Sequence, residues 1–176
     1  MAIDEAKTFI PINIAVLTVS DTRTPETDGS GDILAERIQG AGHSLARRAI
    51  VRDDAGAIAD RIEKWIADEE IDAIVTTGGT GLTGRDVTVE ALSAIDGARD
   101  IPGFGELFRW LSYGTIGTST IQSRACAIVA LGTYVFALPG SRGAVKDGWD
   151  GILAEQLDSR NAPCNFVELM PRLREE

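Results

Sequence analysis

The chain has 176 residues, of which 44% are hydrophobic and 25% charged, and this composition excludes a disordered or fibrous protein. Seventeen basic and 27 acidic residues give a net charge of −10, which disfavours binding to nucleic acid or to an anionic membrane surface. A small anionic ligand stays possible, because backbone N–H groups or a metal ion can reverse the sign of the potential at one site.

Strands and helices alternate along the chain. Residues 14–19 (IAVLTV) form a β-branched apolar run, which is typical of a strand buried on both faces of a parallel sheet. In chain order we then expect a helix at about 32–41, an exposed or edge strand at 44–51, a helix around 55–66, a buried strand at 72–77, helices at 87–95 and 104–111, strands at 126–131 and 133–138, and a helix around 149–157.

This order predicts an α/β fold whose mostly parallel sheet is covered on both faces, with an antiparallel strand added by the late hairpin. No linker divides the chain, so we expect residues 1–176 to form a single domain with a core at about 14–166, a short N-terminal arm and a C-terminal tail. Residues 96–105 (DGARDIPGFG) are expected to be a loop.

Several residues are assigned to the core or the surface by their surroundings. On the helix at 104–111 we expect Phe104, Leu107, Phe108 and Leu111 to share one buried face. The three tryptophans are expected in the core or at a subunit interface. They are Trp65, Trp110 and Trp149.

The small number of histidine and cysteine residues, and their positions, exclude some kinds of metal and catalytic site. His43 is the sole histidine and follows Gly42 in a turn, so we expect it on the surface and expect no histidine-based zinc site or catalytic dyad. Cys126 is expected to be a small core residue, and a single disulfide with Cys164 stays open. The N-terminus lacks signal-peptide features and no apolar stretch reaches about 18 residues, so we expect a cytoplasmic protein.

Four polar or glycine-rich segments follow predicted strands. They are SDTR at 20–23, RDD at 52–54, TTGGTGLTGRD at 76–86 and PGSRG at 139–143. Ligands bind at the carboxyl ends of the strands in open α/β sheets, so these segments are candidates for one site. Because polar loops follow strands in every α/β domain, their position alone does not distinguish a site from ordinary loops.

The segment TTGGTG predicts a phosphate cradle made of a strand, a glycine turn and a helix start. Gly78, Gly79 and Gly81 let the backbone approach a ligand closely, although a glycine turn with nothing bound stays possible. No Gly-Lys-Ser/Thr occurs, which excludes the Walker loop, and no strand is expected before Asp100 to complete a dinucleotide fold. We expect a valine in place of Gly79 to damage ligand binding more than folding.

Asp53 and Asp86 are the candidate catalytic carboxylates. Carboxylates beside a phosphate repel it unless a divalent cation such as Mg²⁺ bridges them, so both are also candidate metal ligands. The alternative is that Asp53, Asp54 and Asp86 cap helices.

The runs TVSDTR, TTGGTGLTGRDVTVEAL, IPGFGELFR, IGTSTIQSRA and ALPGS resemble the molybdenum cofactor biosynthesis protein B family, in the expected order and over about residues 14–166. The tail segment DSRNAPCNF fits this family better than the related adenylyltransferases. The resemblance implies a three-layer α/β/α fold and a homo-oligomer, a trimer or a hexamer. It also implies that ATP and molybdopterin are substrates, that Mg²⁺ is required, and that a molybdate-insertion protein is a possible partner.

The activity implied by the resemblance is transfer of AMP from ATP to the terminal phosphate of molybdopterin, with release of pyrophosphate. Asp86 and, less securely, Asp53 match aspartates needed for activity. The nucleotide- and pterin-binding residues implied are Ser20, Asp21, Thr77, Gly78, Gly79, Thr80, Gly81, Pro139, Gly140 and Ser141. A non-catalytic molybdopterin- or nucleotide-binding carrier, or a scaffold for cofactor assembly, is the alternative.

Overall fold

A six-stranded sheet with the order β2-β1-β3-β6-β5-β4 organises the computed structural model, which describes residues 3–175. The strands are β1 (Asn13–Val19), β2 (Ser44–Val51), β3 (Ala73–Thr77), β4 (Arg99–Asp100), β5 (Cys126–Ala130) and β6 (Thr133–Leu138). β1 pairs in parallel with β2 and β3, and β3 pairs in parallel with β6, whereas β5 is antiparallel to both β6 and β4. The predicted α/β fold with a mostly parallel sheet and a late antiparallel hairpin is confirmed.

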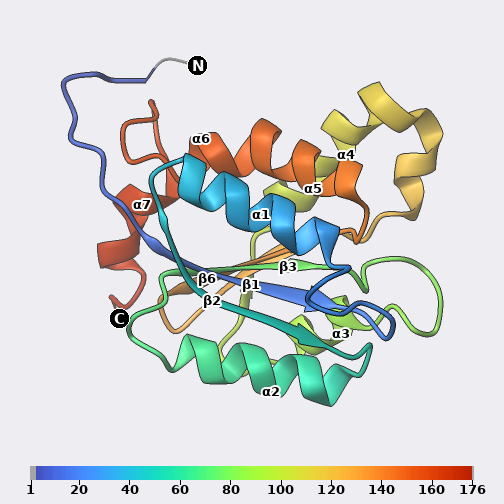
Figure 1. The fold of residues 1–176 in the computed structure, drawn as a ribbon. Helices are drawn as coiled ribbons and strands as arrows, with labels where there is room; N and C mark the ends of the chain where they lie inside the picture. Colours follow the sequence, from blue (N-terminus) through green and yellow to red (C-terminus); the bar gives the residue numbers. More distant parts are fainter. Residues whose placement is uncertain (1–2, 176) are drawn as a thin grey trace.

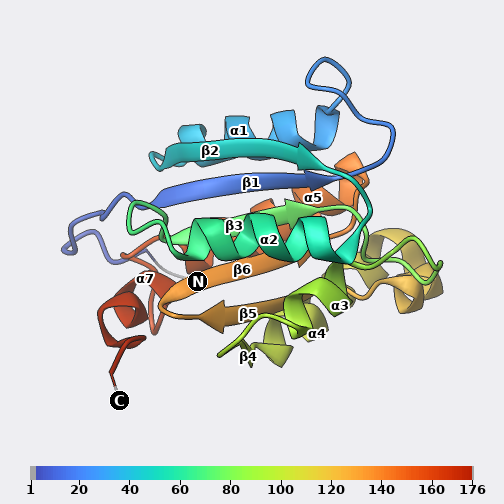
Figure 2. The same cartoon turned by 90° about the horizontal axis from the view of Figure 1, so that it is seen from below.

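Helices cover both faces of the sheet, with α1, α4, α5 and α6 on one face and α2 and α3 on the other (Figures 1 and 2). Their bounds are α1 (Gly29–Gly40), α2 (Ala55–Ile66), α3 (Thr88–Ser93), α4 (Pro102–Ile116), the 3-10 helix η1 (Gly117–Gln122), α5 (Arg142–Gly148), the π-helix η2 (Trp149–Leu153), α6 (Ala154–Gln156), α7 (Phe166–Leu169) and the 3-10 helix η3 (Met170–Arg172). Among the described residues, no helix has the length and apolar character needed to cross a bilayer.

The strand β1 shows why two helical layers form. Successive side chains of a strand point to opposite faces of the sheet, so an entirely apolar run presents a hydrophobic surface on each side. Ile14 and Val16 pack in the cluster with α1, α4 and α5, while Ala15, Leu17 and Val19 pack in the cluster with α2 and α3. The predicted burial of this strand on both faces is confirmed.

Helix α1 begins a few residues earlier than predicted because Asp28 caps it. The Asp28 carboxylate, 1% exposed, accepts hydrogen bonds from the Gly31 N–H (3.0 Å) and the Thr18 hydroxyl (2.8 Å), and it pairs with Arg48 Nη2 at 2.8 Å. Burial by itself raises the pKa of Asp28, but the bonds from Arg48, Gly31 and Thr18 outweigh it and hold the pKa below its ordinary value of 3.8. This carboxylate therefore ties α1 to β1 and β2.

The prediction that His43 lies on the surface is wrong. Its side chain is 6% exposed, because the N-terminal arm crosses over the turn that carries it. The imidazole Nδ1 accepts a hydrogen bond from the Ile12 N–H at 3.3 Å, and the ring lies 5.1 Å from the ring of Phe9. Burial lowers the pKa of His43, which keeps the acceptor nitrogen unprotonated at neutral pH.

The segment before and within α4 also differs from the prediction. The expected loop at 96–105 contains the short strand β4, and α4 starts inside it at a proline, which suits the first turn of a helix. Phe104 and Phe108 are buried as predicted, but Leu107 is 41% exposed and Trp110 is 72% exposed. Trp110 is therefore not a core residue, because α4 contacts the core along a narrower stripe than its composition indicates.

Other assignments hold in whole or in part. Trp65 and Trp149 are buried, and the exposed or edge position predicted for residues 44–51 is confirmed by the place of β2 at the end of the sheet. Cys126 is half-buried and Cys164 exposed, and both are free thiols, which excludes the single disulfide in this structure. Burial raises the pKa of Cys126 to about 11.

Replacing Asp28 by alanine is expected to destabilise the protein by about 3 kcal/mol or more, because it removes a helix cap and one partner of a buried ion pair. The matched control is Asp54→Ala, which removes an exposed cap of α2 and is expected to cost about 1 kcal/mol. Urea unfolding at pH 7 measures both. Since the pKa of Asp28 is lowered by folding, its contribution is complete above pH 3.8 and is lost as the pH falls through the lowered value. Equal losses in the two variants would contradict this role.

Candidate functional site

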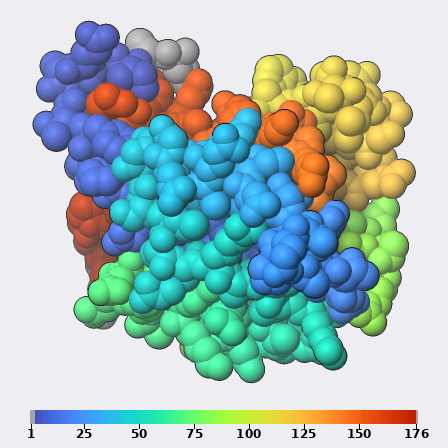
Figure 3. Space-filling view, viewed as in Figure 1, coloured from blue at the N-terminus to red at the C-terminus, as the bar shows by residue number. Residues whose placement is uncertain are grey.

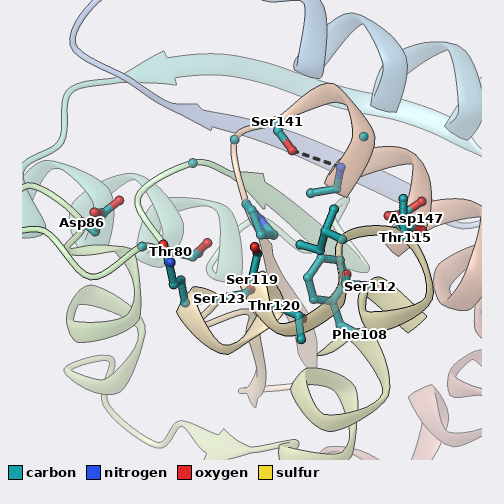
Figure 4. A pocket seen from close by; sticks show the side chains of 18 of the residues that line it. Thr80, Asp86, Phe108, Ser112, Thr115, Ser119, Thr120, Ser123, Ser141 and Asp147 are labelled. Atoms are coloured by element: carbon teal, nitrogen blue, oxygen red, sulfur yellow. Dashed lines mark hydrogen bonds between the residues drawn. The ribbon is translucent and has the colours of Figure 1, made fainter. Parts of the chain in front are cut away.

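The four predicted segments meet at one end of the sheet, where β1, β2, β3 and β6 have their carboxyl ends (Figure 1). A cavity of about 470 Å³ opens there between the glycine loop after β3, the turn after β6, and the α4–η1 segment. Its lining, part of which Figure 4 labels, consists of Gly78, Gly79, Thr80, Gly81, Asp86, Phe108, Ser112, Thr115, Ile116, Ser119, Thr120, Gln122, Ser123, Pro139, Gly140, Ser141, Gly143, Ala144 and Asp147.

The backbone of the glycine loop, defined as residues 78–81, is fixed by its carbonyl groups. The Thr88 hydroxyl donates to the carbonyl of Gly78 (2.9 Å) and the Thr88 N–H donates to that of Gly79 (3.0 Å). The Arg124 N–H donates to the carbonyl of Thr80 (2.9 Å), and the Arg124 Nε donates to that of Gly81 (2.7 Å). All four carbonyls of the loop are thus bonded to two residues outside it.

The same arrangement leaves backbone N–H groups of the glycine loop free to donate hydrogen bonds to a ligand. Within residues 3–175 the N–H groups of Gly79 and Thr80 donate to no protein acceptor, and the Thr80 hydroxyl is buried without a partner. A buried hydroxyl without a partner costs free energy unless a ligand supplies one. The loop therefore fits an anion with several oxygen atoms, such as a phosphate.

The helix that contributes to this cradle is not the predicted one. Residues 82–87 form a loop between the cradle and α3, so α3 does not start at the glycine turn. The start of α5 lines the cavity instead, with the Ser141 hydroxyl accepting from the Ala144 N–H at 3.1 Å. The first turn of a helix presents unpaired N–H groups and a positive dipole end, which favours anions.

The turn at 139–141 is held against the glycine loop. The Thr77 hydroxyl donates to the carbonyl of Pro139 at 3.1 Å, and the Ser30 hydroxyl donates to that of Gly140 at 2.9 Å. Pro139, Gly140 and Ser141 line the cavity, whereas Thr77 does not and instead holds the turn in place.

Asp86 is not a helix cap. The N-cap residue of α3 is Val87, which makes no side-chain capping bond, while Asp86 Oδ2 accepts from the N–H (2.9 Å) and the hydroxyl (2.7 Å) of Thr83. The capping alternative is therefore wrong for Asp86, and α2 is capped by Asp54 rather than by Asp53. Asp53 Oδ2 accepts from the Asp21 N–H at 3.0 Å.

The two candidate carboxylates differ in acidity. Burial, followed by the negative charge of Asp86, raises the pKa of Asp53 above its ordinary value of 3.8. Burial acts on Asp86 in the same direction, but hydrogen bonds from Thr83 and Gly81 and the charge of Arg124 hold its pKa below 3.8. The contribution of Asp86 to this upward shift is a repulsion between two negative charges, and it is smaller than the contribution of burial.

A bound cation would relieve this repulsion. Carboxylate oxygens are hard ligands, and Mg²⁺ is commonly held by one or two carboxylates together with substrate phosphates and water. In residues 3–175 no group of three or more histidine, cysteine, aspartate or glutamate side chains is arranged to hold a metal ion. Asp53 and Asp86 would therefore supply two carboxylate ligands at most, and a cation held by both would need further oxygen ligands from water or from a bound ligand.

Ser20 and Asp21 line a different hollow from that of the glycine loop. This second cavity, of about 600 Å³, lies between the loop after β1 and the strand β2, and Arg23, Arg48 and Arg52 also line it. Asp21 forms an ion pair with Arg85, whose neighbour in sequence is Asp86. Ser20 and Asp21 therefore line a hollow separate from that of the glycine loop, whereas Thr77 and Asp53 line neither of the two. The ion pair between Asp21 and Arg85 connects the second hollow to the segment that carries Asp86.

Sequence reasoning missed two parts of the site. The α4–η1 segment forms a whole wall of the cavity, with Phe108, Ser112 and Ser119 among its lining residues. Arg124 fixes two carbonyls of the glycine loop and also pairs with Glu90. The polar run TSTIQSR at 118–124 contains Ser119 and Arg124, and it is the sequence signal from which these two could have been found.

Comparison with known proteins gives consistent matches. The family model described as a probable molybdopterin binding domain matches residues 15–159. Molybdenum cofactor biosynthesis protein B of Escherichia coli (strain K12) is 49% identical over 158 residues, covering 90% of this chain and 92% of that protein.

Solved structures agree with these matches. The crystal structure of a molybdenum cofactor biosynthesis protein B has a TM-score of 0.85 at 37% identity, covering 97% of this chain and all of that one. The molybdopterin biosynthesis enzyme MoaB of Thermus thermophilus has a TM-score of 0.74 at 27% identity, covering 94% of this chain and 98% of that one.

The structure changes the expectation for valine at position 79. Gly79 has φ +65°, and a Cβ there would overlap the Thr88 hydroxyl and lie 3.3 Å from Val19 Cγ1, on the protein side of the loop. Gly79→Val is therefore expected to lower the free energy of unfolding by about 2–5 kcal/mol, rather than to block the ligand alone. Gly84→Val is the control, because a Cβ at Gly84 meets nothing within 4 Å. Chemical denaturation compares them, and a Gly79 variant as stable as the control would refute the prediction.

Proposed function

The chain belongs to the molybdenum cofactor biosynthesis protein B family, and from this membership we propose that it transfers the adenylyl group of ATP to the terminal phosphate of molybdopterin. The observation that carries the proposal is a single cavity that joins a donor-rich glycine loop, with a buried unpartnered Thr80 hydroxyl, to the carboxylate of Asp86. The loop fits phosphate, and the pair of carboxylates fits the cation that accompanies ATP.

The reaction is a substitution at phosphorus. A terminal phosphate oxygen of molybdopterin forms a bond to the α-phosphorus of ATP, the bond from that phosphorus to the bridging oxygen of the β-phosphate breaks, and pyrophosphate leaves with the electron pair. Such a step needs alignment and charge compensation rather than a covalent protein nucleophile. The chain offers no histidine at the site, since His43 is buried near the N-terminal arm.

The residues of the chain have separable roles in this step. The N–H groups of Gly79 and Thr80 and the Thr80 hydroxyl bind phosphate oxygens, and Arg124 keeps the loop in the geometry that exposes them. Asp53 and Asp86 would hold Mg²⁺, which would supply positive charge to neutralise the phosphates. Because Asp86 has a lowered pKa, it is ionised at neutral pH and ready to bind the cation.

A non-catalytic carrier of molybdopterin or nucleotide is the second candidate function. A carrier needs the cavity and the loop, but it has no requirement for the carboxylate of Asp86.

The exposed apolar residues on α4 and η1 favour a homo-oligomer. Trp110 is 72% exposed, Tyr113 60% and Ile121 81%, and together they lie on a segment that projects from the body of the molecule (Figure 3, yellow). Large apolar side chains exposed on adjoining elements such as α4 and η1 favour association with another protein surface. We propose that copies of this chain pack through this face as a trimer or a hexamer.

Incubating the protein with molybdopterin, ATP and Mg²⁺ is expected to yield adenylylated molybdopterin and pyrophosphate in equal amounts, measured by chromatography. Asp86→Asn is expected to lower the rate by about 10²–10³-fold, since the cation loses a charged ligand. Asp54→Asn is the control, because asparagine caps a helix as well as aspartate does. If the wild type and the Asp86 variant both bind molybdopterin but form product only at the uncatalysed rate, the transferase is refuted and the carrier is supported.

Trp110→Glu is expected to dissociate the oligomer into single chains of 18.7 kDa, because it places a charge in the apolar face. Leu131→Glu is the control, since Leu131 is 70% exposed in the β5–β6 turn at the other end of the sheet. Size-exclusion chromatography with light scattering measures the masses. If the wild-type protein is monomeric at micromolar concentration, the proposed oligomer is refuted.

A further inference from the structure

A second carboxylate lines the cavity away from the glycine loop. Among the described lining residues, only Asp86 and Asp147 carry ionisable side chains. Asp147 is half-buried on α5, and Figure 4 shows it on the opposite side of the lining residues from Asp86. The mechanism above gives Asp147 no role.

The Asp147 carboxylate makes no hydrogen bond or ion pair within residues 3–175. Asp150, further along the same continuous helical segment, does form an ion pair with Arg37, at 2.7 Å. The hydroxyls of Ser112 and Thr115 line the same cavity and also lack protein partners in that part of the chain. This end of the cavity therefore offers a charged acceptor pair and several hydroxyls to a ligand.

The charge of Asp147 decides which part of a ligand fits there. A phosphate is repelled by a carboxylate, so phosphates belong at the glycine loop, where donors are available. A carboxylate binds best to two parallel N–H donors, which its two oxygens accept together. The ligand group expected at this end is therefore an uncharged ring that carries adjacent donors on one edge.

A pterin ring has such an edge. Its 2-amino group and its N3–H point in the same direction, whereas in adenine the amino group stands beside a ring nitrogen that accepts. We propose that Asp147 is a specificity-determining residue that binds the 2-amino-4-oxopyrimidine edge of the pterin. The proposal rests on the proposed function in one respect, that molybdopterin occupies this cavity with its phosphate at the glycine loop.

The apolar lining is consistent with a flat ring between the two ends. Phe108 and Ile116 come from α4, and Pro139 and Ala144 come from the turn and the helix on the other side. Ligand sites commonly combine such apolar walls with a few polar groups that fix orientation. Asp147 would then set the direction of the pterin, and with it the position of the phosphate relative to Asp86.

The test measures the binding of two probes to the intact protein by titration calorimetry. The probes are 6-hydroxymethylpterin and 6-hydroxymethyllumazine, in which a carbonyl replaces the 2-amino group. The wild type is expected to bind the pterin about 10- to 100-fold more tightly than the lumazine. With the lumazine, the Asp147 carboxylate loses the hydrogen bond from the 2-amino group, and one of its oxygens faces the 2-carbonyl oxygen instead. Asp147→Asn is expected to abolish this preference, because its amide can donate to the lumazine carbonyl.

Two controls separate recognition from damage to the fold. Asp150→Asn changes a carboxylate of the same helical segment that does not line the cavity, and it is expected to keep the preference of the wild type. Asp147→Glu keeps the charged acceptor pair and is expected to restore part of the preference. Unchanged Mg²⁺·ATP binding by Asp147→Asn shows that the glycine loop is intact.

The proposal is overturned if Asp147→Asn keeps the pterin-to-lumazine ratio of the wild type. It is also overturned if guanosine, which has the same ring edge, binds to the wild type and the pterin does not. These results are independent of adenylyl transfer. An active enzyme with an unchanged ratio refutes the role of Asp147 alone, and an inactive protein with a shifted ratio refutes the transferase alone.

Discussion

The site depends on the hydrogen bonds that hold the carbonyl groups of the glycine loop. A peptide unit whose carbonyl is fixed on one side presents its N–H on the other, so binding all four carbonyls to Thr88 and Arg124 orients the loop as a donor surface. The same contacts bring Asp86 to the cavity, because Arg124 Nη2 also donates to the Asp86 carbonyl. Arg124 thus positions both the glycine loop and the segment that carries the Asp86 carboxylate.

This arrangement reconciles an acidic protein with an anionic ligand. The net charge of −10 produces a repulsive field at long range, but backbone donors and the start of α5 act over a few ångströms. Burial first, and then the negative charge of Asp86, raise the pKa of Asp53, so the folded chain disfavours the ionised form of this side chain. A positive charge beside the two aspartates would offset this cost.

The fold was predictable where the signal is local. Runs such as IAVLTV are apolar throughout, and a parallel sheet is the structure that buries both faces of a strand, so the strands and their common carboxyl edge followed from the sequence. The predictions of burial were wrong where contacts with segments distant in the sequence determine the exposure of a side chain. His43 is buried by an N-terminal arm that its own neighbours do not reveal, and Leu107 is exposed because only part of α4 contacts the sheet.

The glycine loop, the turn at 139–141 and the acidic residues after the strands could be identified from the amino-acid order alone, because each is a short motif whose chemistry lies in consecutive residues. Three further facts came from the folded chain: which of these motifs share a cavity, that Asp86 is not a cap, and that Arg124 and Asp147 belong to the site. They depend on how α4, η1 and α5 pack against the sheet. Such packing brings together residues far apart in the chain, and no local pattern records it.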